Sequence, residues 1–209
     1  MSYKTIRSRA EASFIEKKSE FIGYISPATT EEEAVGFINE IRAMHRKATH
    51  NCYAYILRNN NTARHSDDGE PGGTAGMPIF DVLSKNGITD AVCVVTRYFG
   101  GILLGTGGLV RAYSQGAKVA LEAGNVVMMQ SCLMCEARCS YNQYGKVSSL
   151  IMEIGAVIDD TVYEADVLIK FHIKPELLDK LNKQLADATS GEIQAVSDSE
   201  KYFMSDTEK

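Results

Sequence analysis

Hydrophobic residues recur at helical spacing between residues 30 and 46, in the segment TTEEEAVGFINEIRAMHR that begins one residue earlier. Apolar positions three and four residues apart predict a helix with one buried face. Thr30 stands before the pattern and Glu33 follows three residues later, which is typical of a capping box. Acidic residues open the segment, and Arg42, His45 and Arg46 close it, as the helix dipole favours. We therefore expect a helix here.

Strand patterns surround this helix. Residues 1–28 hold apolar clusters around a polar centre, and NCYAYIL at 51–57 is rich in aromatic residues, so both predict strands. DAVCVVTRYF at 90–99 is a nearly continuous apolar run, which indicates a strand buried on both faces. Residues 75–86 predict a second helix, with Pro78 in its first turn and Gly87 at its end.

A third helix is predicted from about 107 to 123, with Thr106 or Gly107 at its start and Gly124 at its end. Small residues at 112, 116 and 120 lie four apart, so one face of this helix can approach a sheet closely.

A second unit is predicted from residue 131. The pattern reads strand 131–140, helix 141–155, strands 156–163 and 165–173, helix 175–191 and strand 192–197. This β-α-β-β-α-β order is typical of ferredoxin-like domains. We expect residues 199–209 to be frayed and 124–131 to connect the two units. The expected domains are 1–127 and 131–204, and the expected class is α/β (α+β).

The segment RHSDDGEPGGTAGMP at 64–78 carries the densest chemistry in the chain. Asp67, Asp68 and Glu70 offer carboxylates to a hard cation, and His65 with Asp67 suits a transition metal. The spacing does not match an EF-hand, so no metal site is predicted. The same residues can build a rigid loop through side-chain caps, positive-φ glycines and prolines. A catalytic role in hydrolysis or phosphotransfer remains an alternative.

A second glycine-rich loop, RYFGGILLGTGGLVR at 97–111, joins a buried strand to a helix. Backbone N–H groups at such a junction can face an anion, and Arg97 and Arg111 flank it. The segment matches neither a Walker motif nor the dinucleotide fingerprint. An RNA-backbone or phosphate contact and close helix–sheet packing both fit this composition.

Other reactive residues give weaker patterns. Cys52 and Ser66 are candidate nucleophiles by residue type alone, and no nucleophile elbow or H-E-x-x-H motif is present. Cys132, Cys135 and Cys139 show C-x₂-C-x₃-C spacing, but on a strand the first of them faces away from the other two. We interpret them as small buried packing residues rather than zinc ligands.

Composition limits the classes of function. The net charge is −5, and residues 131–209 hold 8 basic against 14 acidic residues, which leaves +1 for residues 1–130. No general basic surface for DNA is expected, although a local basic patch is compatible with these totals. Five cysteines, no long apolar run and no signal-like N-terminus favour a cytoplasmic protein with free thiols.

Three long motifs in order, KATHNCYAY, SDDGEPGGTAGMPIFDVL and VVTRYFGGILLGTGGLVRAY, closely resemble the signature of the IMPACT/YigZ family. The resemblance covers roughly residues 1–125, and the C-terminal unit resembles the second domain of the bacterial members. It implies an N-terminal domain of the ribosomal-protein second-domain-like βαβ fold, similar to elongation factor G domain IV. It also implies a ferredoxin-like second domain resembling elongation factor G domain V.

Eukaryotic members of that family act in translation control, so the resemblance implies a translation-associated binding protein rather than an enzyme. The implied partners are RNA, the ribosome or a translation-linked protein. No membrane association and no cofactor are expected. A pure protein-interaction module that uses Tyr98 and Phe99 is a further alternative. We expect the two loops to lie side by side, with Arg97 or Arg111 neutralising an acidic residue. The candidate binding residues are Asp67, Asp68, Glu70, Arg97, Tyr98, Gly100, Gly101, Gly105 and Arg111.

Overall fold

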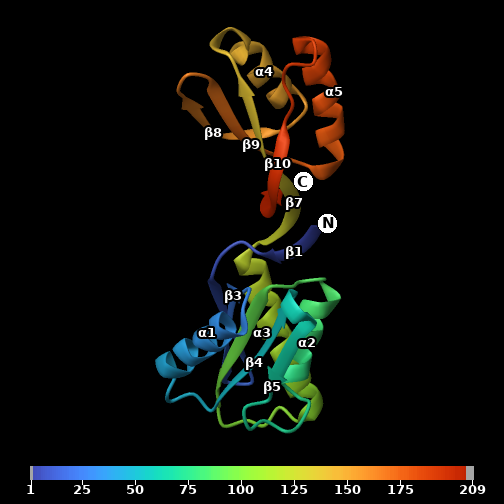
Figure 1. Cartoon of the computed structure of the whole chain (residues 1–209). Coiled ribbons are helices and arrows are strands. Elements are labelled where there is room, and N and C mark those ends of the chain that lie inside the picture. Colours follow the sequence, from blue (N-terminus) through green and yellow to red (C-terminus); the bar gives the residue numbers. More distant parts are fainter. Residues whose placement is uncertain (1, 206–209) are drawn as a thin grey trace. The chain divides into compact units, whose positions relative to one another are not determined.

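The computed structural model describes residues 2–205, which form two compact units, Tyr3–Met128 and Met129–Ser205, with Ser2 grouped with the second (Figure 1). The elements of the first unit, in chain order, are β1 (Ser2–Ile6), β2 (Ala10–Glu16), β3 (Ser19–Pro27), α1 (Glu31–Met44), β4 (His50–Leu57), β5 (Thr62–Ser66), α2 (Gly76–Lys85), β6 (Ala91–Tyr98) and α3 (Thr106–Gly124). A short 3₁₀ turn, Asn59–Asn61, lies between β4 and β5.

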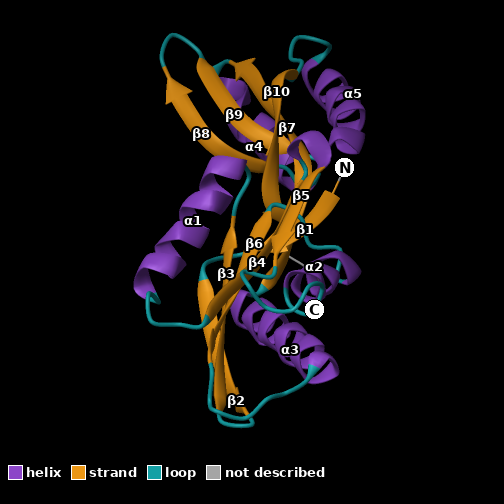
Figure 2. Cartoon of the chain, turned by 90° about the horizontal axis from the view of Figure 1, so that it is seen from below, coloured by secondary structure: helices purple, strands orange, loops and turns teal. Residues whose placement is uncertain are grey.

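The main sheet of this unit has the strand order β2-β3-β6-β4-β5, and the paired strands run antiparallel. Figure 2 shows α1 on one side of these strands and α2 with α3 on the other. Strand β6 lies in the middle and is buried from Ala91 to Arg97, because both of its faces are covered by helices. The continuous apolar run at this strand is therefore explained by the two layers of helices.

Each helix layer encloses its own core. On the α1 side, Phe37, Ile38 and Ile41 pack against the sheet residues Tyr55 and Val94. The other side holds the larger core, in which α2 and α3 pack against the sheet. Its fully buried members include Phe21, Ile25, Ile79, Leu83, Val95, Tyr113 and Ala117. Burial of these side chains supplies the main stabilisation of the unit.

The predicted start of α1 is confirmed in detail. The hydroxyl of Thr30 accepts a hydrogen bond from the Glu33 N–H at 3.2 Å, and the Glu33 carboxylate accepts from the Thr30 N–H at 3.3 Å. These two bonds form the capping box, and they satisfy donors that a helix start otherwise leaves open.

The small face of α3 also lies where the sequence places it. A Cβ built on Gly116 would lie 2.7 Å from a methyl of Val95, and one on Gly23 would lie 2.2 Å from the Gly116 carbonyl oxygen. The backbones of α3 and β3 thus meet at a distance that only glycine permits. Gly105, rather than Thr106 or Gly107, occupies the N-cap position of α3, and it has a φ of 72°.

Strand β5 corrects one part of the sequence reading. Residues 64–66 were expected to belong to the polar loop, but Arg64 and Ser66 pair with Tyr55 and Tyr53 of β4. The edge position of β5 explains the difference, since an edge strand with one solvent face tolerates charged residues. The loop itself therefore begins at Asp67.

The second unit follows the ferredoxin-like pattern. Its elements are β7 (Val126–Cys139), α4 (Tyr141–Glu153), β8 (Val157–Tyr163), β9 (Val167–Ile173), the 3₁₀ turn Pro175–Leu177, α5 (Leu178–Thr189) and β10 (Val196–Ser205). The strand order is β10-β7-β9-β8. The predicted α/β (α+β) class with a ferredoxin-like C-terminal part is confirmed.

Both ends of this unit differ from the prediction. The segment 124–131 is mostly strand, because β7 begins at Val126 rather than 131. The last strand lies at Val196–Ser205, so residues 199–205 are paired and not frayed. Residues 206–209 lie outside the described part of the chain. Within residues 2–205, no helix is long and apolar enough to cross a membrane.

Candidate functional site

One end of the main sheet gathers the loops that the sequence singled out. We call residues 67–75 the acidic loop, residues 99–105 the glycine loop, and this end of the first unit the loop end. The register places Arg97 of β6 opposite His50 of β4, and Tyr98 opposite Glu20 of β3. The glycine loop is tied to its neighbours by the Phe99 N–H, which donates to the Thr49 hydroxyl at 3.2 Å. The two loops therefore meet beside the same strand ends.

Asp67 is the residue that shapes the acidic loop. Its carboxylate accepts backbone N–H groups from Gly73 at 2.8 Å, Ala75 at 3.0 Å and Gly76 at 2.8 Å. Burial would raise the pKa of Asp67, but these three bonds outweigh it and hold the pKa below its usual value. The carboxylate thus fixes the backbone of the acidic loop and binds N–H groups at the start of α2.

Asp68 is bound from two sides. The Arg42 guanidinium donates to one carboxylate oxygen at 2.8 Å, and the Asn51 N–H donates to the other at 2.7 Å. Asp68 has a φ of 45°, and its carbonyl accepts the Nδ1–H of His50 at 2.8 Å. These contacts connect the acidic loop to the end of α1 and the start of β4.

Glu70 lies beneath the surface and ties the acidic loop to β6 and α3, the two elements that flank the glycine loop. Its Oε1 accepts from the Arg97 guanidinium at 2.6 Å and from the Tyr113 hydroxyl at 2.7 Å. The side chains of Arg97 and Glu70 are 6% and 4% exposed, so this is a buried ion pair. The predicted neutralisation of an acidic residue by Arg97 is therefore found in the structure. Both loops leave the sheet at the same end, because β5 and β6 are both antiparallel to β4.

Arg97 is enclosed by aromatic rings as well. Its guanidinium carbon lies 5.5 Å from the ring centre of Phe21 and 5.4 Å from that of Phe99. Its Nε is buried and has no hydrogen-bond partner within the described residues. Aromatic faces attract a guanidinium, and this offsets part of the cost of burying its charge.

Arg111, the alternative to Arg97 in the predicted neutralisation, lies apart from the ion pair between Arg97 and Glu70. It is exposed on α3, and it lines a hollow of about 290 Å³ with Phe14, Lys17 and Leu104. Among the described residues 2–205 it forms no ion pair, whereas Asp67, Asp68 and Glu70 hold other partners. Arg42 donates to Asp68, and Tyr113 donates to Glu70. Neither contact was predicted from the sequence. The position of Arg42 in the last turn of α1, next to the start of β4, is the sequence feature that could have indicated its contact with the acidic loop.

The glycine loop exposes apolar side chains instead of burying them. Phe99 is 46% exposed, Ile102 41% and Leu103 81%. Gly100 lies so close to the β2–β3 turn that a Cβ would meet the Lys18 carbonyl oxygen at 1.9 Å. Gly101 and Gly105 have positive φ values of 84° and 72°, a region that favours glycine. The glycines thus fold the loop back on itself and project its apolar residues outward.

Tyr98 belongs to a polar chain on the α1 side of the sheet. His45 lies between two tyrosines, with its Nε2 2.7 Å from the Tyr24 hydroxyl and its Nδ1 2.9 Å from the Tyr98 hydroxyl. Burial lowers the pKa of His45, although Glu11 and Glu20 act in the opposite direction. Tyr98 is half-buried, so Phe99 is the more exposed of the two aromatic residues.

The candidate nucleophiles are not activated. Cys52 is buried, its thiol donates to the Asp67 carbonyl at 2.9 Å, and burial raises its pKa. The Ser66 hydroxyl accepts the Asp68 N–H at 3.1 Å. Within residues 2–205, no three His, Cys, Asp or Glu residues are grouped to hold a metal ion.

The cysteines at 132, 135 and 139 are free and buried, as are Cys52 and Cys93. Cys135 and Cys139 belong to the core of the second unit, which fits the packing role inferred for them.

The side-chain contacts of Asp67, Asp68 and Glu70 give the loop end a fixed shape, in which the acidic groups are bonded within the unit.

Comparison with known proteins gives two family matches. The Impact N-terminal domain matches residues 17–121, and a domain of unknown function, DUF1949, matches residues 138–192. The first match contains both loops and the whole Asp67–Glu70–Arg97 network, while the second falls in the ferredoxin-like unit.

Similar proteins extend over most of the chain. The IMPACT family member YvyE of Bacillus subtilis (strain 168) is 35% identical, covering 91% of this chain and 88% of its own. The IMPACT family member YigZ of Escherichia coli (strain K12) is 34% identical, covering 87% and 90%. A crystal structure of a hypothetical protein is 31% identical, covers 95% of this chain and 98% of its own, and gives a TM-score of 0.60. The chain therefore belongs to the IMPACT family.

Proposed function

We propose that this protein is a translation-associated regulator that binds RNA, in free form or on the ribosome, through the loop end of its first unit. The observation that carries the proposal is the internal neutralisation of the acidic loop. Asp67 is bound by backbone N–H groups, Asp68 by Arg42 and Glu70 by Arg97. Carboxylates that are bonded in this way repel a phosphate backbone less than free ones do.

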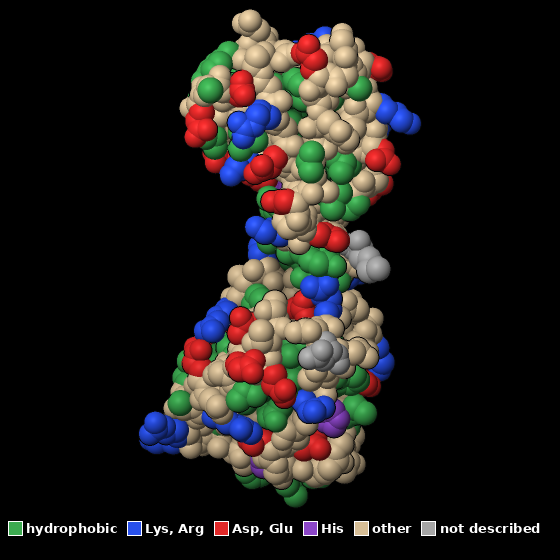
Figure 3. Space-filling model, viewed as in Figure 1, with side chains coloured by type: hydrophobic (Ala, Val, Ile, Leu, Met, Phe, Trp, Pro, Cys, Tyr) green, Lys and Arg blue, Asp and Glu red, His purple; other side chains and the backbone are tan. Residues whose placement is uncertain are grey.

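Exposed basic side chains lie on segments next to the glycine loop, which contacts the β2–β3 turn through Gly100 and the turn after α1 through Thr49. The β2–β3 turn carries Lys17 and Lys18, the turn after α1 carries Arg46 and Lys47, and α3 carries Arg111, all of them exposed. In the described part of the chain, none of these five residues forms an ion pair. Figure 3 shows Lys and Arg side chains and exposed hydrophobic side chains toward the lower end of the first unit. Unpaired lysine and arginine are the groups that contact phosphates.

Phe99 supplies the second element of RNA recognition. It is exposed at the end of β6, next to a turn that bears positive charge. Unpaired bases stack on aromatic side chains, and each such contact contributes about 1–3 kcal/mol. Basic residues near an exposed aromatic ring therefore favour single-stranded or looped RNA over a DNA duplex.

The test is binding of a labelled RNA stem-loop and of purified ribosomes across a salt series. We expect affinity to fall steeply with salt, and the Lys17→Ala/Lys18→Ala double variant to flatten the slope by about 1–2. Phe99→Ala is expected to weaken binding at every salt concentration. Lys183→Ala, an exposed change on α5 of the second unit, is the matched control and leaves binding unchanged. Absence of binding to both probes at low salt would end the RNA proposal.

A translation-linked protein is the second candidate partner, and the exposure of Ile102 and Leu103 favours it. Exposed apolar residues at a loop tip are typical of protein contacts, and they contribute little to phosphate binding. Under this alternative, Leu103→Ser abolishes binding of the partner while salt has little influence. A hydrolase or phosphotransfer activity has no comparable support, since the carboxylate and thiol groups of the loop end are engaged in structural bonds.

A further inference from the structure

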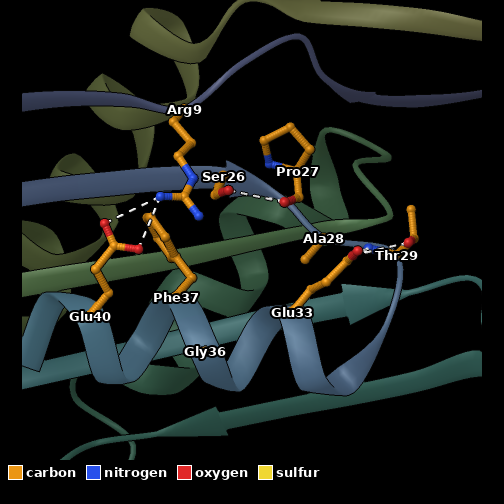
Figure 4. A pocket seen from close by; sticks show the side chains of 9 residues that line it. All are labelled: Arg9, Ser26, Pro27, Ala28, Thr29, Glu33, Gly36, Phe37 and Glu40. Atoms are coloured by element: carbon orange, nitrogen blue, oxygen red, sulfur yellow. Dashed lines mark hydrogen bonds and ion pairs between the residues drawn. The ribbon is translucent and has the colours of Figure 1, made fainter.

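A second hollow lies away from the loop end, between α1 and the C-terminal end of β3 (Figure 4). It measures about 770 Å³, and Pro27, Ala28, Gly36, Phe37, Arg9 and Glu40 are among the residues that line it. This volume falls in the range of pockets that bind ligands or peptide side chains. A smaller hollow of about 230 Å³ shares Arg9, Phe37 and Glu40 with it. The two hollows are therefore adjacent along α1, and Arg9, Phe37 and Glu40 lie between them. We call the two hollows together the groove.

Arg9 lies between the two hollows and contacts both Glu40 and Phe37. Arg9 Nη1 donates to both carboxylate oxygens of Glu40, at 3.2 and 3.0 Å. The guanidinium carbon lies 5.2 Å from the ring centre of Phe37, within the range of a cation–π contact. Figure 4 shows the Arg9 side chain reaching down to Glu40 beside Phe37. A carboxylate and an aromatic ring are the two groups that recognise a guanidinium.

This contact is easily exchanged. The side chains of Arg9 and Glu40 are 61% and 49% exposed. Ion pairs between exposed side chains contribute little to stability, because water competes for both charges. An arginine from another molecule can therefore replace Arg9 without disturbing the fold of the unit.

The groove favours a cation. Its lining includes the carboxylates of Glu40 in both hollows and of Glu11 in the smaller one, against the single basic residue Arg9, while the Glu33 carboxylate is already bonded to Thr29 and Thr30. Gly36 adds open space, since a Cβ on it would meet no atom within 4 Å. A glycine inside an exposed helix is unfavourable for the helix, and packing within the unit does not explain it here.

We propose that this groove binds an arginine-bearing segment of a partner protein, whose guanidinium takes the place of Arg9 between Phe37 and Glu40. Arg9 acts as an internal competitor, and a neighbouring apolar side chain of the segment contacts the exposed lining residue Pro27. The groove is distinct from the loop end, so this inference does not depend on RNA binding.

The test uses a capped Leu-Arg-Leu peptide, titrated into the full chain and followed by the amide shifts of α1. We expect Arg9→Ala to bind the peptide about threefold more tightly, because the competing side chain is gone. Glu40→Gln is expected to bind about fivefold more weakly, since the carboxylate partner is lost. Gly36→Gln is expected to prevent binding by filling the groove, while the helix persists.

Two controls make the result specific. Glu32→Gln alters an exposed carboxylate of the same helix that does not line either hollow, and it should leave the affinity unchanged. A peptide with citrulline in place of arginine has the same shape without the charge, and it should bind at least fivefold more weakly. Absence of peptide binding by both wild type and Arg9→Ala, or equal binding of both peptides, would overturn the proposal.

Discussion

The acidic loop and the glycine loop meet at the same strand ends, yet they are built in opposite ways. The acidic loop directs its charged groups inward, onto backbone N–H groups, Arg42 and Arg97. The glycine loop directs apolar side chains outward, and Leu103 is 81% exposed. The residues that look most reactive in the sequence therefore maintain shape, whereas the residues that look like core are at the surface. The surface available to a partner is accordingly the glycine loop and its basic neighbours.

The largest expected effect comes from the buried ion pair. Glu70→Ala leaves the Arg97 charge buried without its partner, and we expect the free energy of unfolding to fall by about 3–5 kcal/mol. Urea denaturation measures this change. Glu20→Ala, at an exposed position opposite Tyr98, is the matched control and should stay within about 0.5 kcal/mol of wild type. A loss under 1 kcal/mol for Glu70→Ala would contradict the structural role of the acidic loop.

The next effect tests how the glycine loop is folded. Gly100→Ala places a methyl group against the Lys18 carbonyl, and we expect a loss of about 3 kcal/mol as the backbone moves. Gly101→Ala meets no neighbouring atom but keeps a positive φ, so about 1 kcal/mol is expected. Thermal unfolding of both variants gives the two losses of stability. The loss in Gly100→Ala reports the steric clash, and the loss in Gly101→Ala reports the strain of a positive φ. Equal losses would show that the contact with the β2–β3 turn is unimportant.

A smaller effect concerns Asp67 and pH. We expect Asp67→Asn to lose about 2 kcal/mol at pH 7, since three backbone donors lose a charged acceptor. The pKa of Asp67 is lowered in the folded state, so its contribution is complete above the ordinary value of about 4 and is lost as pH falls through the folded pKa. The stability difference between wild type and variant should therefore shrink below pH 4. A difference that stays constant down to pH 2 would contradict this linkage.

The smallest effect on stability is expected at the tip of the glycine loop. Leu103→Ser should change the free energy of unfolding by less than about 0.5 kcal/mol, because the side chain is mostly in water. The same variant should weaken partner binding if the tip is a contact surface. Leu109→Ser, in the buried core of α3, is the contrasting variant and should destabilise strongly. Strong destabilisation by Leu103→Ser would contradict the exposed placement of the tip.

Much of the fold follows from local patterns in the sequence. The capping box at Thr30, the small face around Gly116 and the apolar strand before Arg97 all lie where periodicity and spacing predicted them. Two errors lie at the edge strands β5 and β10, whose polar content hides a strand pattern, and a third lies at the start of β7, which begins at Val126. Hydrophobic patterning is weakest at such positions, since burial no longer separates the two faces.

The candidate site was less predictable than the fold. The sequence predicted that Arg97 or Arg111 neutralises Asp67, Asp68 or Glu70, and the structure pairs Arg97 with Glu70. Tyr113 closes the third motif and Arg42 lies in the last turn of α1, but neither of them was predicted to have a partner in the acidic loop. Of the two arginines predicted to neutralise an acidic residue, Arg97 does so, while Arg111 is exposed on α3. The role of the candidate residues in binding stays a prediction.

The burial of all five cysteines has a practical consequence for such experiments. Burial raises the pKa of each thiol, so little thiolate, the reactive species in alkylation, is present at neutral pH. A single cysteine introduced at position 103 would then react far faster with a maleimide dye than any native one. The tip of the glycine loop can thus carry a fluorophore in the otherwise native sequence, and its environment can be observed directly as a partner arrives.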